Sequence, residues 1–118
     1  MIERNTNLGT VNISLDAVAT VTGGAATECY GVVGMASQKK LIDGFYELLG
    51  RDNYAKGIEV KDGDSGVILD LYVILGYGIK MTEVLYEVQK KVKYVVESTL
   101  DLNVEAVNIY VQGIRSVE

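Results

Sequence analysis

The chain has few side chains of the types that carry catalysis. It contains no histidine, which removes the commonest general base, the Ser-His-Asp arrangement and most transition-metal sites. Cys29 is the single cysteine and lies in an apolar stretch, which is typical of a small buried residue rather than an activated thiol. Asp62 and Asp64 lie close together, but no glutamate follows at the offset that a calcium loop requires, and a hairpin turn explains them better. The sequence therefore predicts no catalytic residue, no cofactor site and no metal site, and a protein that is not an enzyme.

A Gly-x-x-Gly spacing occurs at Gly31, Val32, Val33 and Gly34. We expect this segment to be a tight connector between two helices. This arrangement resembles the KH module, in which a Gly-x-x-Gly loop between two helices clamps a nucleic-acid backbone. A KH-like RNA-binding module is therefore one alternative interpretation, with Gly31–Gly34 as the contact loop. Aliphatic side chains cannot pair with a phosphate, and the formal net charge of −5 repels nucleic acid, so nucleic acid is a disfavoured partner.

Hydrophobic periodicity predicts the elements that position these residues. We expect residues 1–7 to be a frayed N-terminus and residues 8–118 to form a single domain of the α+β class. The order is β-α-α-β-β-α-β, a two-layer sandwich with its helices packed on one face of a small sheet. The predicted strands cover residues 8–13, 57–61, 67–76 and 104–114, and the predicted helices cover residues 15–29, 39–49 and 79–99. Gly23 and Gly24 weaken the first helix, but such small residues could let another backbone approach closely.

The strand over residues 67–76 has two different faces. Its odd-numbered residues are all aliphatic and are expected to contact the helices, whereas its even-numbered residues include Asp70 and Tyr72 and are mixed. Eight tyrosines are many for a chain of this length, and tyrosine is enriched at protein–protein contacts. We therefore predict an interaction surface that includes Tyr72, Ile74, Tyr77 and Tyr110. The terminal strand, 104–114, is a candidate for self-association if it lies at a sheet edge.

Composition limits the location of the protein. Apolar residues make up 48% of the 118 residues and charged residues 23%, which is typical of a globular domain. No apolar run approaches the length that spans a bilayer, and residues 1–5 lack the apolar core of a signal peptide. A single cysteine suits a reducing compartment. We expect a cytoplasmic protein without direct membrane insertion, which reaches a membrane only through a partner.

Several segments, in their order along the chain, resemble the alkaline-shock protein family, envelope stress response proteins of Gram-positive bacteria. The resemblance spans about residues 8 to 115. The segments that carry it are GTVNIS (9–14), ECYGVVGM (28–35), GIEV (57–60), DLYV (70–73), YG (77–78), VQKKV (88–92) and VNIYVQGI (107–114).

The resemblance implies a non-enzymatic cytoplasmic protein of cell-envelope homeostasis or the stress response. It also implies self-association, with assemblies held at the membrane by a separate anchor protein. The leading hypothesis is therefore a scaffold or adaptor that works as a homo-oligomer through contacts with other proteins. The alternatives are the KH-like RNA-binding module and a binder of a small apolar ligand between helix and sheet.

Overall fold

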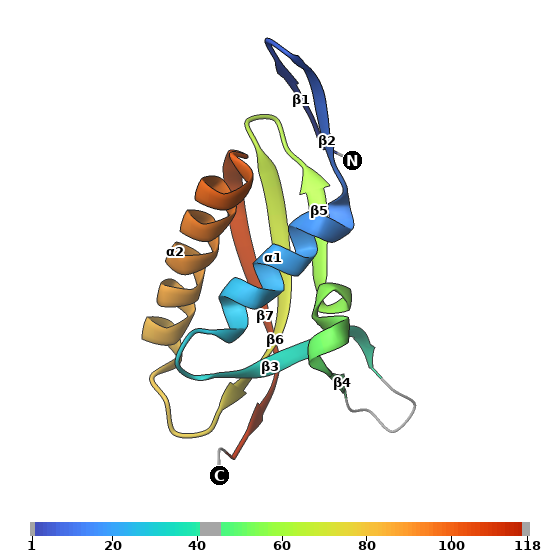
Figure 1. Ribbon diagram of the computed structural model, residues 1–118. Helices are drawn as coiled ribbons and strands as arrows, with labels where there is room; N and C mark the ends of the chain where they lie inside the picture. Colours follow the sequence, from blue (N-terminus) through green and yellow to red (C-terminus); the bar gives the residue numbers. More distant parts are fainter. Residues whose placement is uncertain (1, 41–45, 117–118) are drawn as a thin grey trace.

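The computed structural model describes residues 2–40 and 46–116, in which a layer of helices lies over a layer of strands (Figure 1). Strand β6 lies in the interior of the sheet, and helices α1 and α2 lie over it. The elements are β1 (Ile2–Thr6), β2 (Gly9–Ile13), α1 (Leu15–Thr27), β3 (Val32–Lys40), β4 (Tyr46–Leu49), the 3₁₀ helix η1 (Arg51–Gly57), β5 (Ile58–Asp62), β6 (Val67–Gly76), α2 (Met81–Leu100) and β7 (Val104–Arg115).

Strand β6 organises the larger sheet because it has neighbours on both sides. Strand β7 runs parallel to β6 along its whole length, from Val67 opposite Val104 to Gly76 opposite Arg115. On the other side, β5 pairs antiparallel with the first half of β6, and β3 pairs with the second half. Strand β4 pairs antiparallel with β3. Among the described strands, β7 is therefore one edge of this sheet, and it is paired on one side only.

The core lies between the helices and one face of β6. The odd-numbered residues of β6, from Val67 to Leu75, are all nearly fully buried, as the alternation predicted. Helix α2 packs onto them with the valines that recur at helical spacing: Val84, Val88, Val92 and Val96. Helix α1 adds Val18, Ala25 and Ala26. The α+β class and the placement of the helices on one face of the sheet are confirmed.

Helix α1 and the 3₁₀ helix η1 pack closely together at Gly23. A Cβ atom on Gly23 would lie 3.1 Å from Cβ of Tyr54, which is closer than side chains ordinarily pack. A glycine costs helix stability in the middle of α1, but here it allows the backbone of η1 to approach. The prediction that small residues in this helix admit another segment is confirmed.

The predicted helix over residues 39–49 is wrong where the structure describes it. Residues 39–40 end strand β3 and Tyr46–Leu49 form strand β4, while residues 41–45 lie outside the described part. Met35 lies opposite Leu49 and Ala36 opposite Leu48 in this antiparallel pair. Pairing with a neighbouring strand satisfies the backbone of this segment in place of helical hydrogen bonds, and no local pattern reveals it.

The N-terminus is also more ordered than predicted. Residues 2–6 were expected to be frayed, but they form β1, which pairs antiparallel with β2 from Ile2 opposite Ile13 to Thr6 opposite Gly9. Their polar composition gave no strand signal, because both faces of this two-stranded ribbon are largely exposed to solvent. The ribbon projects beyond the end of the larger sheet (Figure 1).

Candidate interaction surface

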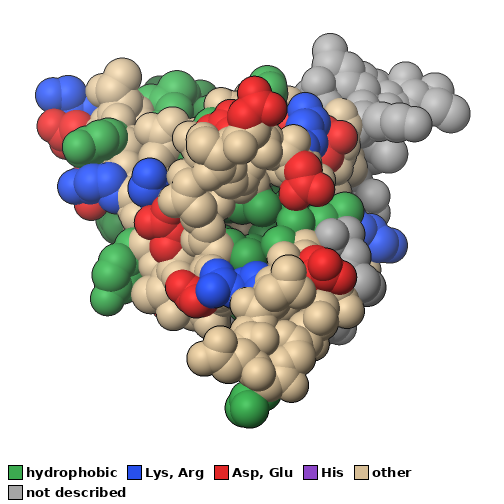
Figure 2. Space-filling view, turned by 90° about the horizontal axis from the view of Figure 1, so that it is seen from above, with side chains coloured by type: hydrophobic (Ala, Val, Ile, Leu, Met, Phe, Trp, Pro, Cys, Tyr) green, Lys and Arg blue, Asp and Glu red, His purple; other side chains and the backbone are tan. Residues whose placement is uncertain are grey.

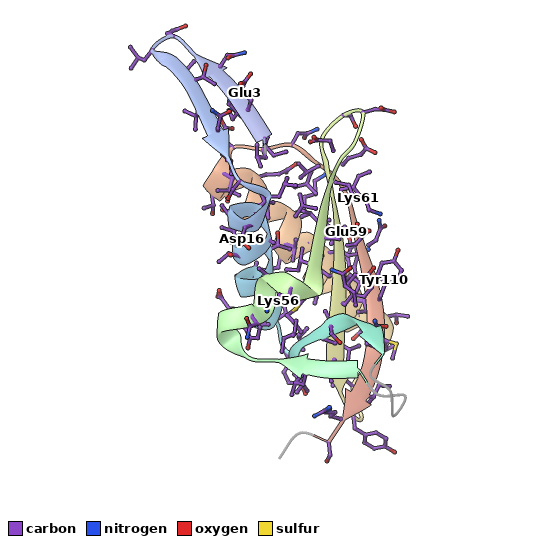
Figure 3. The ribbon with its side chains drawn as sticks, turned by 90° about the vertical axis from the view of Figure 1, so that its right-hand side faces the viewer. Glu3, Asp16, Lys56, Glu59, Lys61 and Tyr110 are labelled. Atoms are coloured by element: carbon purple, nitrogen blue, oxygen red, sulfur yellow. The ribbon has the colours of Figure 1, made fainter. Side chains whose placement is uncertain are left out.

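The face of the sheet that points away from the helices carries a cluster of polar and aromatic side chains from three strands. Strand β5 supplies Glu59 and Lys61, and β6 and β7 supply the remaining members. We call this set the outer-face cluster: Glu59, Lys61, Asp70, Tyr72, Asn108 and Tyr110. Figure 3 shows Glu59, Lys61 and Tyr110 on the side of the sheet opposite the helices. The register explains the grouping, since Glu59 lies opposite Asp70 and Asp70 opposite Asn108.

Asp70 is the buried charge at the centre of the outer-face cluster. It is only 2% exposed, although it lies on the outer face. Nζ of Lys61 lies 2.9 Å from one carboxylate oxygen, and Nδ2 of Asn108 donates a 2.9 Å hydrogen bond to the other. Burial raises the pKa of Asp70, but the hydrogen bonds from Lys61 and Asn108 and the charge of Lys61 together hold this pKa below its ordinary value. Asp70 therefore stays ionised and links β5, β6 and β7.

Two tyrosines cover the outer face beside Asp70. The rings of Tyr72 and Tyr110 are stacked, with centroids 4.9 Å apart and an angle of 14° between their planes. Burial and the nearby charge of Asp70 raise the pKa of the Tyr72 hydroxyl, so this ring stays neutral. Tyr110 remains 46% exposed. The stack is a flat, partly exposed aromatic surface of the kind that protein contacts use.

The edge of β7 is covered over its first part only. Helix α2 provides this cover with three side chains. Gln89 Nε2 donates to the carbonyl of Val107 at 2.9 Å, and Lys93 Nζ donates to the carbonyl of Val104 at 3.4 Å. Glu97 accepts from the backbone N–H of Val104 at 2.9 Å. Within the described residues, no side chain bonds to the backbone of residues 108–115, so the second part of the edge is open.

The structure separates the four residues predicted as an interaction surface. Tyr72 and Tyr110 lie together in the outer-face cluster. Ile74 shares this face but is only 2% exposed, and it lies between Gly34 of β3 and Gly113 of β7, which pair with it on either side. Ile74 therefore offers no contact surface. Tyr77 lies apart, in the turn after β6, where it is 79% exposed.

Sequence reasoning missed Lys61, Asp70 and Asn108 as members of one cluster. The available signal was an aspartate inside an otherwise apolar strand, because a carboxylate at such a position needs a partner. One partner comes from the neighbouring hairpin strand, and the other comes from a strand 38 residues further along the chain. The sequence does not show that these strands flank β6.

The predicted connector at Gly31–Gly34 is wrong, because it does not join two helices. Gly31 ends the turn after α1, and Val32, Val33 and Gly34 begin strand β3. The residues that follow are strand, so the helix that a KH-type loop would enter is not found at residues 32–40. The geometric basis for a KH-like contact loop is therefore lost.

We expect Gly31→Ala to destabilise the fold. Gly31 has a φ of +91°, and a Cβ atom there would lie 3.0 Å from side-chain carbons of Ile79 and Val84. Left-handed backbone strain and crowding predict a loss of about 1–3 kcal/mol in the free energy of unfolding, measurable by urea denaturation. Gly24→Ala is the matched control, since a Cβ there meets nothing within 4 Å and alanine favours the helix. Equal stability of Gly31→Ala and the unmodified protein would contradict the left-handed backbone and the crowded surroundings described for Gly31.

A groove of about 430 Å³ lies between the end of α1 and the start of α2. Its lining includes Cys29, Tyr30 and Val84, but five charged side chains contribute as well: Glu28, Lys80, Glu83, Glu87 and Lys91. Burial raises the pKa of the Cys29 thiol, which opposes thiolate chemistry. The groove therefore differs from the apolar space between helix and sheet that the small-ligand interpretation expected.

The described residues form neither a metal-binding cluster nor a membrane-spanning helix. Residues 2–40 and 46–116 contain no group of three or more histidine, cysteine, aspartate or glutamate side chains placed to hold a metal ion. Over the same residues, neither helix combines the length and the apolarity needed to cross a bilayer.

The comparison with known protein families decides the identity of the chain. An alkaline-shock family model, described as having a cell envelope-related function, matches residues 3–116. The chain belongs to the alkaline-shock protein family. The resemblance found in the sequence is thereby confirmed, and the function of the family is related to the cell envelope.

Relatives of this alkaline-shock family protein occur in Gram-positive bacteria. It is 46% identical to YloU of Bacillus subtilis (strain 168) over 114 residues, which is 97% of this chain and 95% of YloU. It is 47% identical to Spy1614 of Streptococcus pyogenes serotype M6 over 116 residues, which is 98% of this chain and 96% of the relative. Both relatives are described as uncharacterized. No solved structure gives a significant match.

Proposed function

We propose that this alkaline-shock family protein is a non-enzymatic scaffold of the cell envelope, which self-associates through the open part of strand β7. It acts in the cytoplasm and reaches the membrane through a protein partner. The outer-face cluster is the surface that contacts this partner. The observation that carries the proposal is the long edge strand, β7, whose second part has no cover among the described residues. The cell envelope-related function of the family supports the setting.

The composition of β7 favours pairing with another chain. From Ala106 to Ile114 the strand has neither a charged residue nor a proline, which are the devices that usually protect edge strands. Tyr110 and Ile114 are 46% and 51% exposed, so side chains as well as backbone are available. A second copy that pairs antiparallel with β7 around a two-fold axis would satisfy the backbone groups of both edges.

The test is sedimentation equilibrium of the full chain over a range of concentrations, with an edge variant. We expect the unmodified protein to show a mass above that of the monomer, and Ile114→Lys to shift association to at least about tenfold higher concentration, because a lysine on the edge opposes strand pairing. Tyr94→Lys is the matched control, since Tyr94 is 71% exposed on α2 and is not part of β7. A strict monomer at every concentration, or equal loss of association in both variants, would overturn the proposal.

A further inference from the structure

The N-terminal ribbon, β1 and β2, is an arm that extends past the sheet (Figure 1). Leu8 at its tip is 99% exposed, and Val11 on β2 is 49% exposed. Residues 5–15 carry no charge. In Figure 2, which looks down on the end of the molecule that bears the arm, red and blue side chains are instead interspersed over the body.

The arm is anchored at its base and ordered at its tip. At the base, Ile2 and Ile13 pack against the core, and Arg4 binds Asp101 at the end of α2 with an ion-pair distance of 2.8 Å. At the tip, the Thr6 hydroxyl donates to the carbonyl of Gly9 at 3.1 Å and accepts from the N–H of Leu8 at 3.1 Å. The turn is therefore preorganised and presents Leu8 outward, which lowers the entropy cost of binding.

A two-stranded ribbon is only marginally stable in water without further strands or a packed face. The two strands of the arm differ in whether they can pair with the same strand of a second copy. Antiparallel self-pairing of β1 about its middle residue would place Arg4 opposite Arg4, and like charges directly opposite destabilise a sheet. Self-pairing of β2 about its middle residue places Val11 opposite Val11 and Thr10 opposite Asn12, with no charge involved.

We propose that β2 pairs antiparallel with β2 of a second copy, with the two-fold axis at Val11. This contact rests on the proposed self-association but uses a surface separate from β7. It joins the two arms into a four-stranded ribbon, buries the exposed Val11 side chains against each other and brings the uncharged tips alongside the partner arm.

Disulfide trapping tests this pairing without depending on a loss of stability. The variant carries Val11→Cys together with Cys29→Ser, and it is oxidised at micromolar concentration with copper phenanthroline. Directly opposite Cα atoms in an antiparallel pair are about 4.5–5.5 Å apart, which is within the range that a disulfide spans. We expect a disulfide-linked dimer that forms at least about tenfold faster than from the matched control, Tyr94→Cys with Cys29→Ser, because pairing raises the effective concentration of the thiols.

The outcomes separate this inference from the proposed function. Cross-linking of Val11→Cys at the rate of the Tyr94→Cys control overturns the β2 pairing, whatever Ile114→Lys does. Fast cross-linking that persists in the Ile114→Lys background supports the β2 pairing as an independent contact. Fast cross-linking together with no effect of Ile114→Lys on association supports β2 pairing and rejects the β7 edge.

Discussion

Leu71→Ala is expected to lower the free energy of unfolding by about 2–5 kcal/mol. Leu71 is fully buried in the middle of β6, opposite Ile58 of β5 and Ile109 of β7. Its side chain fills space between the sheet and the helices, and strands on each side of β6 restrict how far the structure can collapse into the cavity. The loss therefore combines the transfer free energy of the removed carbons with the free energy of the cavity that remains.

Urea denaturation at a fixed protein concentration measures this effect, since association would otherwise change the apparent stability. Leu8→Ala is the matched control, because the same substitution at a side chain that is 99% exposed should change the free energy by at most about 0.5 kcal/mol. A loss at Leu71 no larger than the loss at Leu8 would show that β6 is not the centre of the core.

Asp70→Asn is expected to lower stability at neutral pH by about 1–3 kcal/mol, because it removes a buried carboxylate that accepts hydrogen bonds from Lys61 and Asn108. The same carboxylate predicts a pH dependence. Its pKa in the folded protein is below the ordinary value, so the unfolded chain binds this proton first as the pH falls. The stabilisation is complete above the ordinary aspartate pKa of about 3.9 and is lost as the pH falls through the lower folded-state pKa.

Urea midpoints measured from neutral pH into this acidic window test the assignment. The unmodified protein should lose stability more steeply than Asp70→Asn, and the difference between them should shrink toward low pH. Asp64→Asn is the matched control, since Asp64 is exposed in the turn between β5 and β6. An Asp70→Asn variant with the same acid slope as the unmodified protein would show that Asp70 is not the carboxylate that links these strands.

The two predictions bear on function because both concern strands that hold β7 in place. Asn108 is the contact between Asp70 and β7, and the open part of this strand starts at Asn108. Lys61 reaches Asp70 from β5, and the hydrogen bond to Asp70 raises the pKa of Lys61. The outer-face cluster thus fixes the edge strand against the sheet while it leaves Tyr110 exposed for contact.

Local sequence patterns predicted the strands and helices that bury one apolar face, marked by alternating residues in a strand or by a stripe of apolar residues along a helix. The strand over 67–76 has the predicted bounds, and α2 and β7 differ from prediction by at most two residues at either end. These segments have strong periodicity because each buries one face in the core. The residues from 39 to 49 also carry apolar side chains at helical spacing, yet those described are strand, because pairing with a neighbour overrides such a pattern.

The sequence by itself determined the fold class, the family and the absence of histidine chemistry, since these depend on residue types and on their order along the chain. Tertiary structure alone decided that β7 is an edge, that Ile74 is covered while Tyr110 is exposed, and that Lys61 and Asn108 meet at Asp70. It also decided that residues 2–6 form part of an arm. All of these depend on which strands become neighbours, and hydrogen bonds between strands distant in the chain leave no periodic signal in either strand.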